Sequence, residues 1–304
     1  MRVFDSRKIE LITAFLFLVC SSIFAAEPIN NENSGKRTTY SNPVITDFTY
    51  HDSSIIDGED GYIYSFVSRI VPRVPDKKYV FNQVNIFRSR DMVTWEFYKP
   101  AFLENDVAFL NDKKKNRFIW APNVIHYKGK YLLFVSLRYT IQDVKIGVLE
   151  SDSIGKDFKF NNVLVSTSSK DVNAKVDSEE LIDPFPISDG KNLYLFYGSF
   201  RKDRKGRNME TKEKTAVYVV KLVNKDGVWQ KEGNPIFVTD YYEGICVIKR
   251  KGKYHLFGTC GSWRNNTYQI GYASSKKITG PYKNKEGKLI NDALNYNNSS
   301  VIFS

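Results

Sequence analysis

Three carboxylates and a tryptophan stand at similar places in a repeated pattern of the sequence. Asp52, Asp183 and Glu243 each precede a short apolar run, and Trp120 precedes another such run between the first two. A carboxyl group at the entrance of an apolar strand is paired, neutral or functional, because burying an unpaired charge is costly. Two carboxyl groups on opposite sides of a glycosidic bond can hydrolyse it, one protonating the leaving oxygen and the other taking a proton from water.

The neighbours of the three carboxyl groups favour different roles for them. Glu243 lies among aromatic and aliphatic residues, and apolar surroundings raise the pKa of a carboxyl group, as a general acid requires. Asp52, beside His51, suits the general base. Asp183 suits a third role, which is to maintain the protonation and orientation of the acid. Inversion would need the acid and the base about 6.5–9.5 Å apart, which leaves room for water.

Four segments with one layout carry these residues. Each begins with polar or small residues, continues as a short apolar strand, turns at a glycine and returns as an aromatic-rich strand; the segments are 51–68, 120–136, 181–200 and 243–262. Alternation and turn chemistry predict a β-hairpin in each. A second strand–turn–strand pattern follows each hairpin, so that a four-stranded unit recurs roughly every 60 to 70 residues.

The hairpin at 243–262 is predicted in more detail. A two-residue turn at Lys251-Gly252 would place Cys246 opposite Phe257 and Cys260 opposite Glu243. The two cysteines are then out of register, so we expect no disulfide across this hairpin.

Repeated four-stranded units predict an all-β fold, a β-propeller. A β-sandwich is the alternative, and the long repeat and the matched hairpins argue against it. In a propeller the first strand of each blade lines the central channel. We therefore expect Asp52, Trp120, Asp183 and Glu243 to meet around a shallow pocket at one end of the axis.

The first 39 residues are expected to lie outside the propeller. Residues 1–26 combine an early positive charge, a short apolar run and small residues, as a signal peptide does. Residues 27–39 form a polar linker, and residues 40–304 form the predicted catalytic domain. The expectation is a secreted or periplasmic protein, and Cys20 leaves open an outer-surface lipoprotein.

The charge of the chain does not indicate a nucleic-acid partner. The 304 residues carry a formal net charge of +11, but the basic residues are scattered or lie in predicted loops, without an arginine-rich helix or a zinc-finger spacing. No feature implies a protein partner. The two cysteines that follow the leader are too few for a metal cluster.

From about residue 40 to its end the chain resembles glycoside hydrolase family 43, five-bladed propeller enzymes that cut arabinan and xylan. The segments that carry the resemblance are "NPVITDFTYHDSSII", "WAPNVIHYKGKY", "LIDPFPISDGKNLYLFYGSF", "YYEGICVIKRKGKYHLFG" and "SKKITGPYKNKEGK". The later segments are most similar to the endo-acting arabinanase branch.

The resemblance implies inverting hydrolysis of an arabinan- or xylan-type oligosaccharide or polysaccharide. It makes Asp52 the general base, Asp183 the modulator of the acid's pKa and Glu243 the general acid. It also implies sugar contacts, which are made by His51, by Trp120 and by a loop of Gly198, Ser199 and Phe200. No cofactor is assigned: the resemblance suggests a channel metal such as calcium, but its usual histidine is not found.

Other features depart from the family pattern and leave alternatives open. Ser53, Asn123 and Ile245 replace residues that are usual in the family. We expect about four complete blades, with a fifth missing or incomplete. The final "NNSSVIFS" is either the first strand of a fifth blade, which puts Asn298 in the place of the histidine, or part of the preceding loop.

Three functional alternatives accompany these departures. The first is an exo-acting β-xylosidase or α-L-arabinofuranosidase. The second is a carbohydrate-binding propeller without catalysis. The third is a structural propeller that binds protein, which no feature of the sequence supports.

Overall fold

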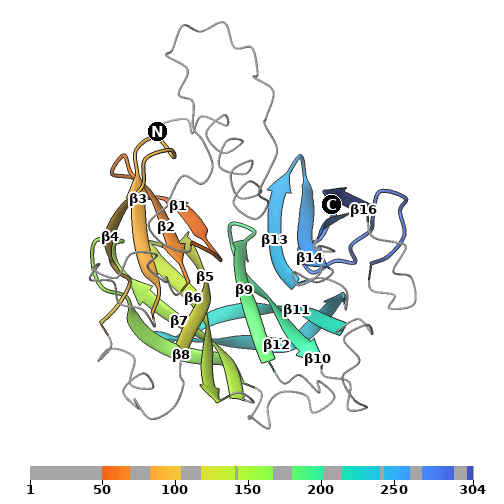
Figure 1. Cartoon of the computed structure of the whole chain (residues 1–304). Coiled ribbons are helices and arrows are strands. Elements are labelled where there is room, and N and C mark those ends of the chain that lie inside the picture. Colours follow the sequence, from red (N-terminus) through yellow and green to blue (C-terminus); the bar gives the residue numbers. More distant parts are fainter. Residues whose placement is uncertain are drawn as a thin grey trace, which may run out of the picture.

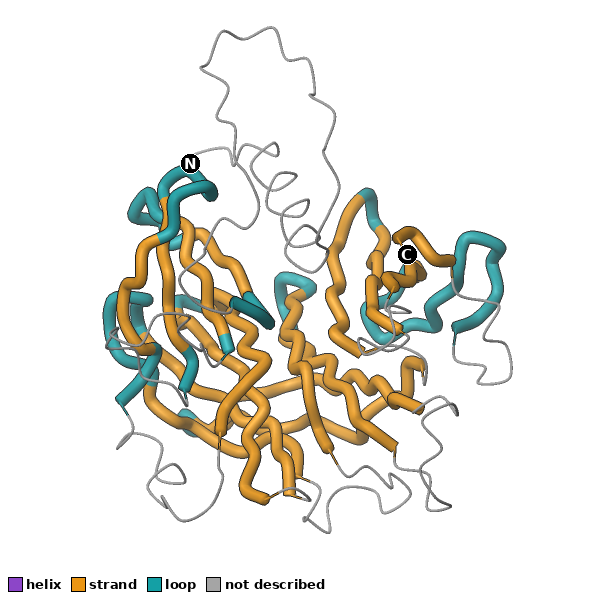
Figure 2. Tube along the Cα trace, viewed as in Figure 1, coloured by secondary structure: helices purple, strands orange, loops and turns teal. Residues whose placement is uncertain are grey.

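The computed structural model describes residues 50–68, 83–103, 118–140, 143–166, 180–201, 214–239, 243–260, 269–290 and 300–303. The predicted leader and linker lie outside these ranges. Every regular element within them is a β-strand (Figure 2). No helix in the described part of the chain is long and apolar enough to cross a membrane.

Within the described ranges, sixteen strands form four antiparallel sheets of four strands each, and the strands of each sheet are consecutive in the chain. The first sheet, blade 1, contains β1 (Ser54–Asp57), β2 (Ile63–Val67), β3 (Asn85–Ser89) and β4 (Glu96–Pro100). Blade 2 contains β5 (Phe118–Tyr127), β6 (Lys130–Thr140), β7 (Asp143–Ser151) and β8 (Lys159–Ser166). Blade 3 contains β9 (Glu180–Ser188), β10 (Leu193–Arg201), β11 (Lys214–Lys225) and β12 (Val228–Thr239). Blade 4 contains β13 (Glu243–Arg250), β14 (Lys253–Cys260), β15 (Gln269–Ser275) and β16 (Ser300–Phe303).

The four blades follow one another around a common centre (Figure 1). The first strands are innermost, because β1 lies against β5, β5 against β9 and β9 against β13. The prediction of a propeller with four complete blades is therefore confirmed for the described residues.

Separate hydrophobic clusters hold consecutive blades together. One cluster joins blades 1 and 2 through residues such as Phe66 and Leu133, and a second joins blades 2 and 3 through Phe134 and Leu195. A third joins blades 3 and 4 around Phe196. This packing follows from strand alternation, because successive side chains of a strand point to opposite faces of its sheet. A blade with a neighbour on each side therefore packs against both.

A two-residue turn closes the inner hairpin of blade 4 where the sequence predicts it. Lys251 and Gly252 both have a positive φ, 48° and 74°, and Arg250 pairs with Lys253. These are the backbone signs of a type I′ turn, whose twist matches that of the flanking strands. The predicted turn is therefore confirmed.

The register at the head of the same hairpin differs from the prediction. Cys246 pairs with Phe257 as expected, but Glu243 pairs with Thr259 and not with Cys260, because the register shifts between Glu243 and Cys246.

The end of blade 4 also differs from the prediction. A strand, turn and second strand were expected directly after β14, but β15 is followed by an irregular segment held by bridges from Lys283 to Ser274 and Leu289. The strand that completes the blade is β16, which pairs with β15. The final segment is therefore the fourth strand of blade 4, neither a fifth-blade strand nor a loop. Asn298 lies outside the described residues.

Candidate active site

The innermost strand of every blade begins with the same irregularity, a β-bulge. In blade 3, Ile182 pairs with Gly198 and Phe185 with Phe196, so that two residues of β9 oppose one residue of β10. Blades 2 and 4 show the same two-against-one count. In blade 1 the bulge lies just before β1. There, the N–H of Ser68 donates to the carbonyl oxygen of His51, and the next pair along is Ser54 with Phe66. A bulge of this kind bends a strand and re-aims the side chain at its head.

The first residue of each bulge has a left-handed backbone. These residues are Asp52, Ala121, Asp183 and Gly244, with φ of 53°, 49°, 54° and 57°. Glycine adopts this conformation freely and aspartate tolerates it, whereas alanine is strained there by roughly 1 kcal/mol or more. Such strain gathers at positions that the surrounding structure fixes for function.

This alignment corrects the expectation that three carboxylates occupy equivalent positions. Asp52 and Asp183 are equivalent, but Glu243 stands one residue earlier, at the position of His51 and Trp120. The reason is that Gly244 supplies the left-handed residue of blade 4, so that the carboxylate is on the residue before it.

Two hydrogen-bonding partners hold the Asp52 carboxylate. Ser68 donates its hydroxyl to Asp52 Oδ2 at 2.7 Å, and His51 Nδ1 lies 3.4 Å from the same oxygen. Partial removal of water raises the pKa of Asp52, but the hydrogen bonds with His51 and Ser68 outweigh it and leave the pKa below its ordinary value. With 45% of its side chain accessible, Asp52 is an ionised carboxylate that water can reach.

The pKa of Asp183 is shifted in the opposite direction from that of Asp52. Burial raises its pKa most, and the charges of Asp52 and Glu243 raise it further, to about 7. The backbone N–H of Gly244 donates to Asp183 Oδ2 at 3.0 Å, which lowers the pKa only in part. Asp183 therefore holds a proton close to neutral pH.

The three carboxyl groups form one electrostatic unit. Repulsion between Asp183 and each of the other two is mutual, so their titrations belong to the group as a whole. A cluster with one ionised carboxylate and one retained proton can supply a base and an acid at the same pH.

The structure places the remaining candidate residues on two inner hairpins. Trp120 is half-buried on β5 and pairs with Ser136 of β6. Gly198, Ser199 and Phe200, expected in a loop, instead lie within strand β10, where they pair with the start of β9 and with β11. Gly198 is buried next to the bulge that carries Asp183.

The described residues offer no ligand set for the channel metal that the sequence suggested. Within the described ranges, no three histidine, cysteine, aspartate or glutamate side chains are placed to hold a metal ion together. The three carboxyl groups interact by charge without forming such a set, and we assign no residue to a metal.

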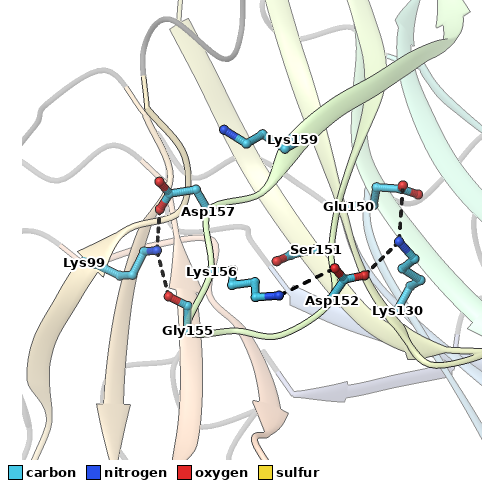
Figure 3. Close-up of a pocket in the computed structure, with 9 residues that line it drawn as sticks. All are labelled: Lys99, Lys130, Glu150, Ser151, Asp152, Gly155, Lys156, Asp157 and Lys159. Atoms are coloured by element: carbon cyan, nitrogen blue, oxygen red, sulfur yellow. Dashed lines mark hydrogen bonds and ion pairs between the residues drawn. The ribbon is translucent and has the colours of Figure 1, made fainter.

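A pocket of about 530 Å³ lies elsewhere, between blades 1 and 2 (Figure 3). Its cations pair with its own carboxylates: Lys99 pairs with Asp157, and Lys130 lies 2.8 Å from Asp152. Lys130 begins β6, six residues before Ser136, so the pocket is about 20 Å along the strand from the residue that pairs with Trp120. It contains no candidate catalytic residue, and its ion pair between Lys99 and Asp157 links the two blades.

Sequence reasoning missed Ser68, which contacts Asp52 directly. A signal for it was present, because Ser68 and Ser136 both end a "FVS" triplet at the close of a predicted hairpin. Aligning the second strands of the repeats would have shown a small residue opposite each strand head.

The fold and the site define a class of β-propeller proteins with a carboxylate cluster at the heads of the inner strands. The sequence profile of glycosyl hydrolases family 43 matches residues 40–300. The chain belongs to this family.

Curated relatives and solved structures agree with this assignment. The chain is 29% identical to extracellular endo-alpha-(1->5)-L-arabinanase 1 of Bacillus subtilis over 67% of its own length and 61% of that protein. It is 25% identical to the extracellular exo-alpha-(1->5)-L-arabinofuranosidase ArbA of Cellvibrio japonicus, over 73% of this chain and 67% of the relative. The GH43 endo-arabinanase from Bacillus licheniformis has the same fold, with a TM-score of 0.59 and 23% identity over 84% of this chain and 80% of that one. The chain thus spans about three fifths of the Bacillus subtilis relative.

Proposed function

We propose that this protein is a secreted glycoside hydrolase that cleaves α-1,5-linked arabinan, or a related arabinose- or xylose-containing polysaccharide of plant cell walls, with inversion. The observation that carries the proposal is the position of Asp183, whose pKa is raised by burial and further by the charges of both Asp52 and Glu243. Its interaction with both groups supports the role of a third carboxyl group that modulates the protonation of the acid, because a nearby negative charge raises the pKa of a carboxyl group.

Each carboxyl group has one role in the proposed reaction. Asp52 removes a proton from a water molecule, whose oxygen attacks the anomeric carbon. The bond from that carbon to the glycosidic oxygen breaks, and Glu243 gives its proton to the departing oxygen. Asp183 becomes more negative as the pH rises, and this charge opposes loss of the proton from Glu243.

The proposed sugar contacts surround this cluster. His51 and Trp120 occupy the same position in their blades as Glu243, so their side chains are candidates for the subsites on either side. Gly198, Ser199 and Phe200 would contact the sugar beside Asp183. Endo-action is favoured because of the similarity to the Bacillus subtilis endo-arabinanase, and exo-action, as in the Cellvibrio japonicus relative, is the alternative.

Secretion is supported by the leader-like residues 1–26 and by the two relatives, both of which are named extracellular. Mass spectrometry of the protein recovered outside the cell should give a chain that begins near Glu27. A chain that keeps the leader and stays in the cytosol would contradict secretion.

The function is tested by incubating the mature chain, from about Glu27, with linear α-1,5-arabinan. We expect oligosaccharides of mixed length on chromatography, and proton NMR of the first products should show the inverted anomer. Release of arabinose or a single short product would point to exo-action. A folded chain that binds arabino-oligosaccharides and forms no product would refute the hydrolase in favour of a binding propeller.

Replacing Asp183 with asparagine should change both activity and stability with pH. The folded-state pKa of about 7 lies above the ordinary value of 3.8, so the ionised carboxyl destabilises the fold as the pH rises through this window. We expect the variant to gain stability relative to the wild type between pH 4 and pH 8, by at most about 4 kcal/mol. Loss of the Asp183 charge should also lower the pKa of Glu243 and move the alkaline limb of the activity profile to lower pH.

Urea unfolding at several pH values measures the stability effect, and kcat/KM against pH measures the effect on catalysis. Asp226→Asn is the matched control, because Asp226 has the same left-handed backbone, φ 52°, in the exposed turn between β11 and β12. If the Asp183 and Asp226 variants show the same pH dependence, the proposed role of Asp183 is wrong.

A further inference from the structure

One residue on the second strand of each blade lies opposite the head of the inner strand. These residues are Ser68, Ser136, Gly198 and Thr259, which pair in turn with His51, Trp120, Ile182 and Glu243. All four are small, and each stands next to the left-handed residue of its own blade. The chemistry of this one position therefore decides what a carboxylate on the left-handed residue can contact.

In blade 1 the residue at this position is a serine whose hydroxyl has a fixed orientation. Ser68 is 1% exposed, and its Oγ lies 2.7 Å from both Asp52 Oδ2 and the backbone nitrogen of Ala121. An amide N–H can only donate, so the serine oxygen accepts there and its single hydrogen points to Asp52. The strained backbone of Ala121, in the next blade, thus orients the hydrogen bond to the carboxylate.

In blade 3 the same position has no side chain. Gly198 offers Asp183 no hydroxyl group, and the N–H of Gly244 from the next blade bonds directly to Asp183 Oδ2 at 3.0 Å. Two aspartates with the same backbone conformation therefore have different surroundings: Asp52 is bonded by a hydroxyl and by His51, whereas Asp183 has a backbone N–H and two neighbouring carboxyl groups.

Blade 2 provides the comparison in which no carboxylate is present. Ala121 stands where Asp52 and Asp183 stand, and Ser136 stands where Ser68 does. Within the described residues the Ser136 hydroxyl is buried without a hydrogen-bond partner. Among the described residues, a serine at this position therefore makes no such contact where the left-handed residue has no carboxylate.

We propose that Ser68 is a positioning residue of the reaction, whose hydroxyl fixes the Asp52 carboxylate as the base, and that its replacement by Gly198 in blade 3 leaves the equivalent Asp183 free to act as the proton-holding partner. This inference rests on the proposed function, in which Asp52 activates water. Ser68 itself does not touch the substrate in this scheme and acts through Asp52.

The direction in which the pKa of Asp52 should change follows from the groups that face this carboxylate. His51 and Ser68 stabilise its charge, and Asp183 interacts with it unfavourably, as Asp183 does with Glu243. Removing the Ser68 hydroxyl takes away one of the stabilising bonds, so that Asp52 takes up a proton at a higher pH. The acidic limb of kcat/KM reports this group in the free enzyme.

The test compares the pH profiles of four full-length mature chains: the wild type, Ser68→Ala, Ser68→Thr and Ser136→Ala. We expect the acidic limb of the kcat/KM profile of Ser68→Ala to lie about one pH unit higher than that of the wild type. Below the limb, kcat/KM should fall by about tenfold, with little change in KM. Ser68→Thr should restore the wild-type limb, because it keeps the hydroxyl and Thr259 shows that blade 4 accommodates threonine there. Ser136→Ala removes a buried hydroxyl of the same kind and should leave the limb in place.

The inference is overturned if Ser68→Ala loses activity or stability without a shift of the limb, or if Ser136→Ala shifts it equally. An inactive wild-type chain would instead refute the proposed function. A double-mutant cycle of unfolding free energies then tests the contact itself. Ser68→Ala and Asp52→Gly, which removes the carboxylate and adopts the left-handed φ freely, should be coupled at pH 7, and additive effects would overturn the pairing as well.

Discussion

Replacing Glu243 with glutamine is expected to lower the cleavage of arabinan by about 10²- to 10⁴-fold, the usual contribution of a general acid. Glutamine keeps the size of the side chain but has no proton to give to the departing sugar oxygen. A substrate whose leaving group needs no proton, such as a nitrophenyl arabino-oligosaccharide, should lose much less. The ratio of the two losses therefore identifies the acid, which a single activity measurement does not.

The matched control for this variant is Glu232→Gln. Glu232 pairs with Lys221 on the outer strands of blade 3, and 49% of its side chain is accessible. The control should retain wild-type rates on both substrates. Equal losses on both substrates for Glu243→Gln would show that Glu243 is not the general acid and that it acts in binding or folding.

The blades could be predicted from the sequence because their signals are local. Glycine at a two-residue turn, as in Lys251-Gly252, and alternating apolar residues determine a hairpin within about twenty residues. The repeat then implies the number of blades. Local signals failed for the last blade, where 24 residues of the chain lie between β15 and β16 and the pairing is not local.

The details of the site were harder to predict because of the bulges. A bulge adds one residue to a strand without changing its composition, so Cys260 was expected opposite Glu243 where the structure has Thr259. Glu243 stands one residue before the position of Asp52 and Asp183, because Gly244 takes that position in blade 4. The bond from Ser68 to Asp52 depends on the amide of Ala121, 53 residues along the chain, and no local pattern contains that information.

Replacing Asp52 with asparagine is expected to reduce cleavage by a similar or larger factor, about 10²- to 10⁴-fold or more, on arabinan and on the activated substrate alike. The amide cannot take a proton from water, and the need to activate water does not depend on the leaving group. The Asp52 and Glu243 variants should therefore differ on the activated substrate although both fail on the polysaccharide.

The Asp52 variant is expected to fold normally, so its loss of activity has a chemical meaning. Asparagine tolerates the left-handed φ of 53° as aspartate does, and its amide oxygen can still accept the Ser68 hydroxyl. Unfolding measured by circular dichroism checks this. Asp57→Asn, at the far end of the strand that follows Asp52, controls for the loss of a nearby aspartate and should keep full activity. An Asp52→Asn chain that is folded and cleaves either substrate at the wild-type rate would show that another group activates the water, and with it the role proposed for Ser68 would fall.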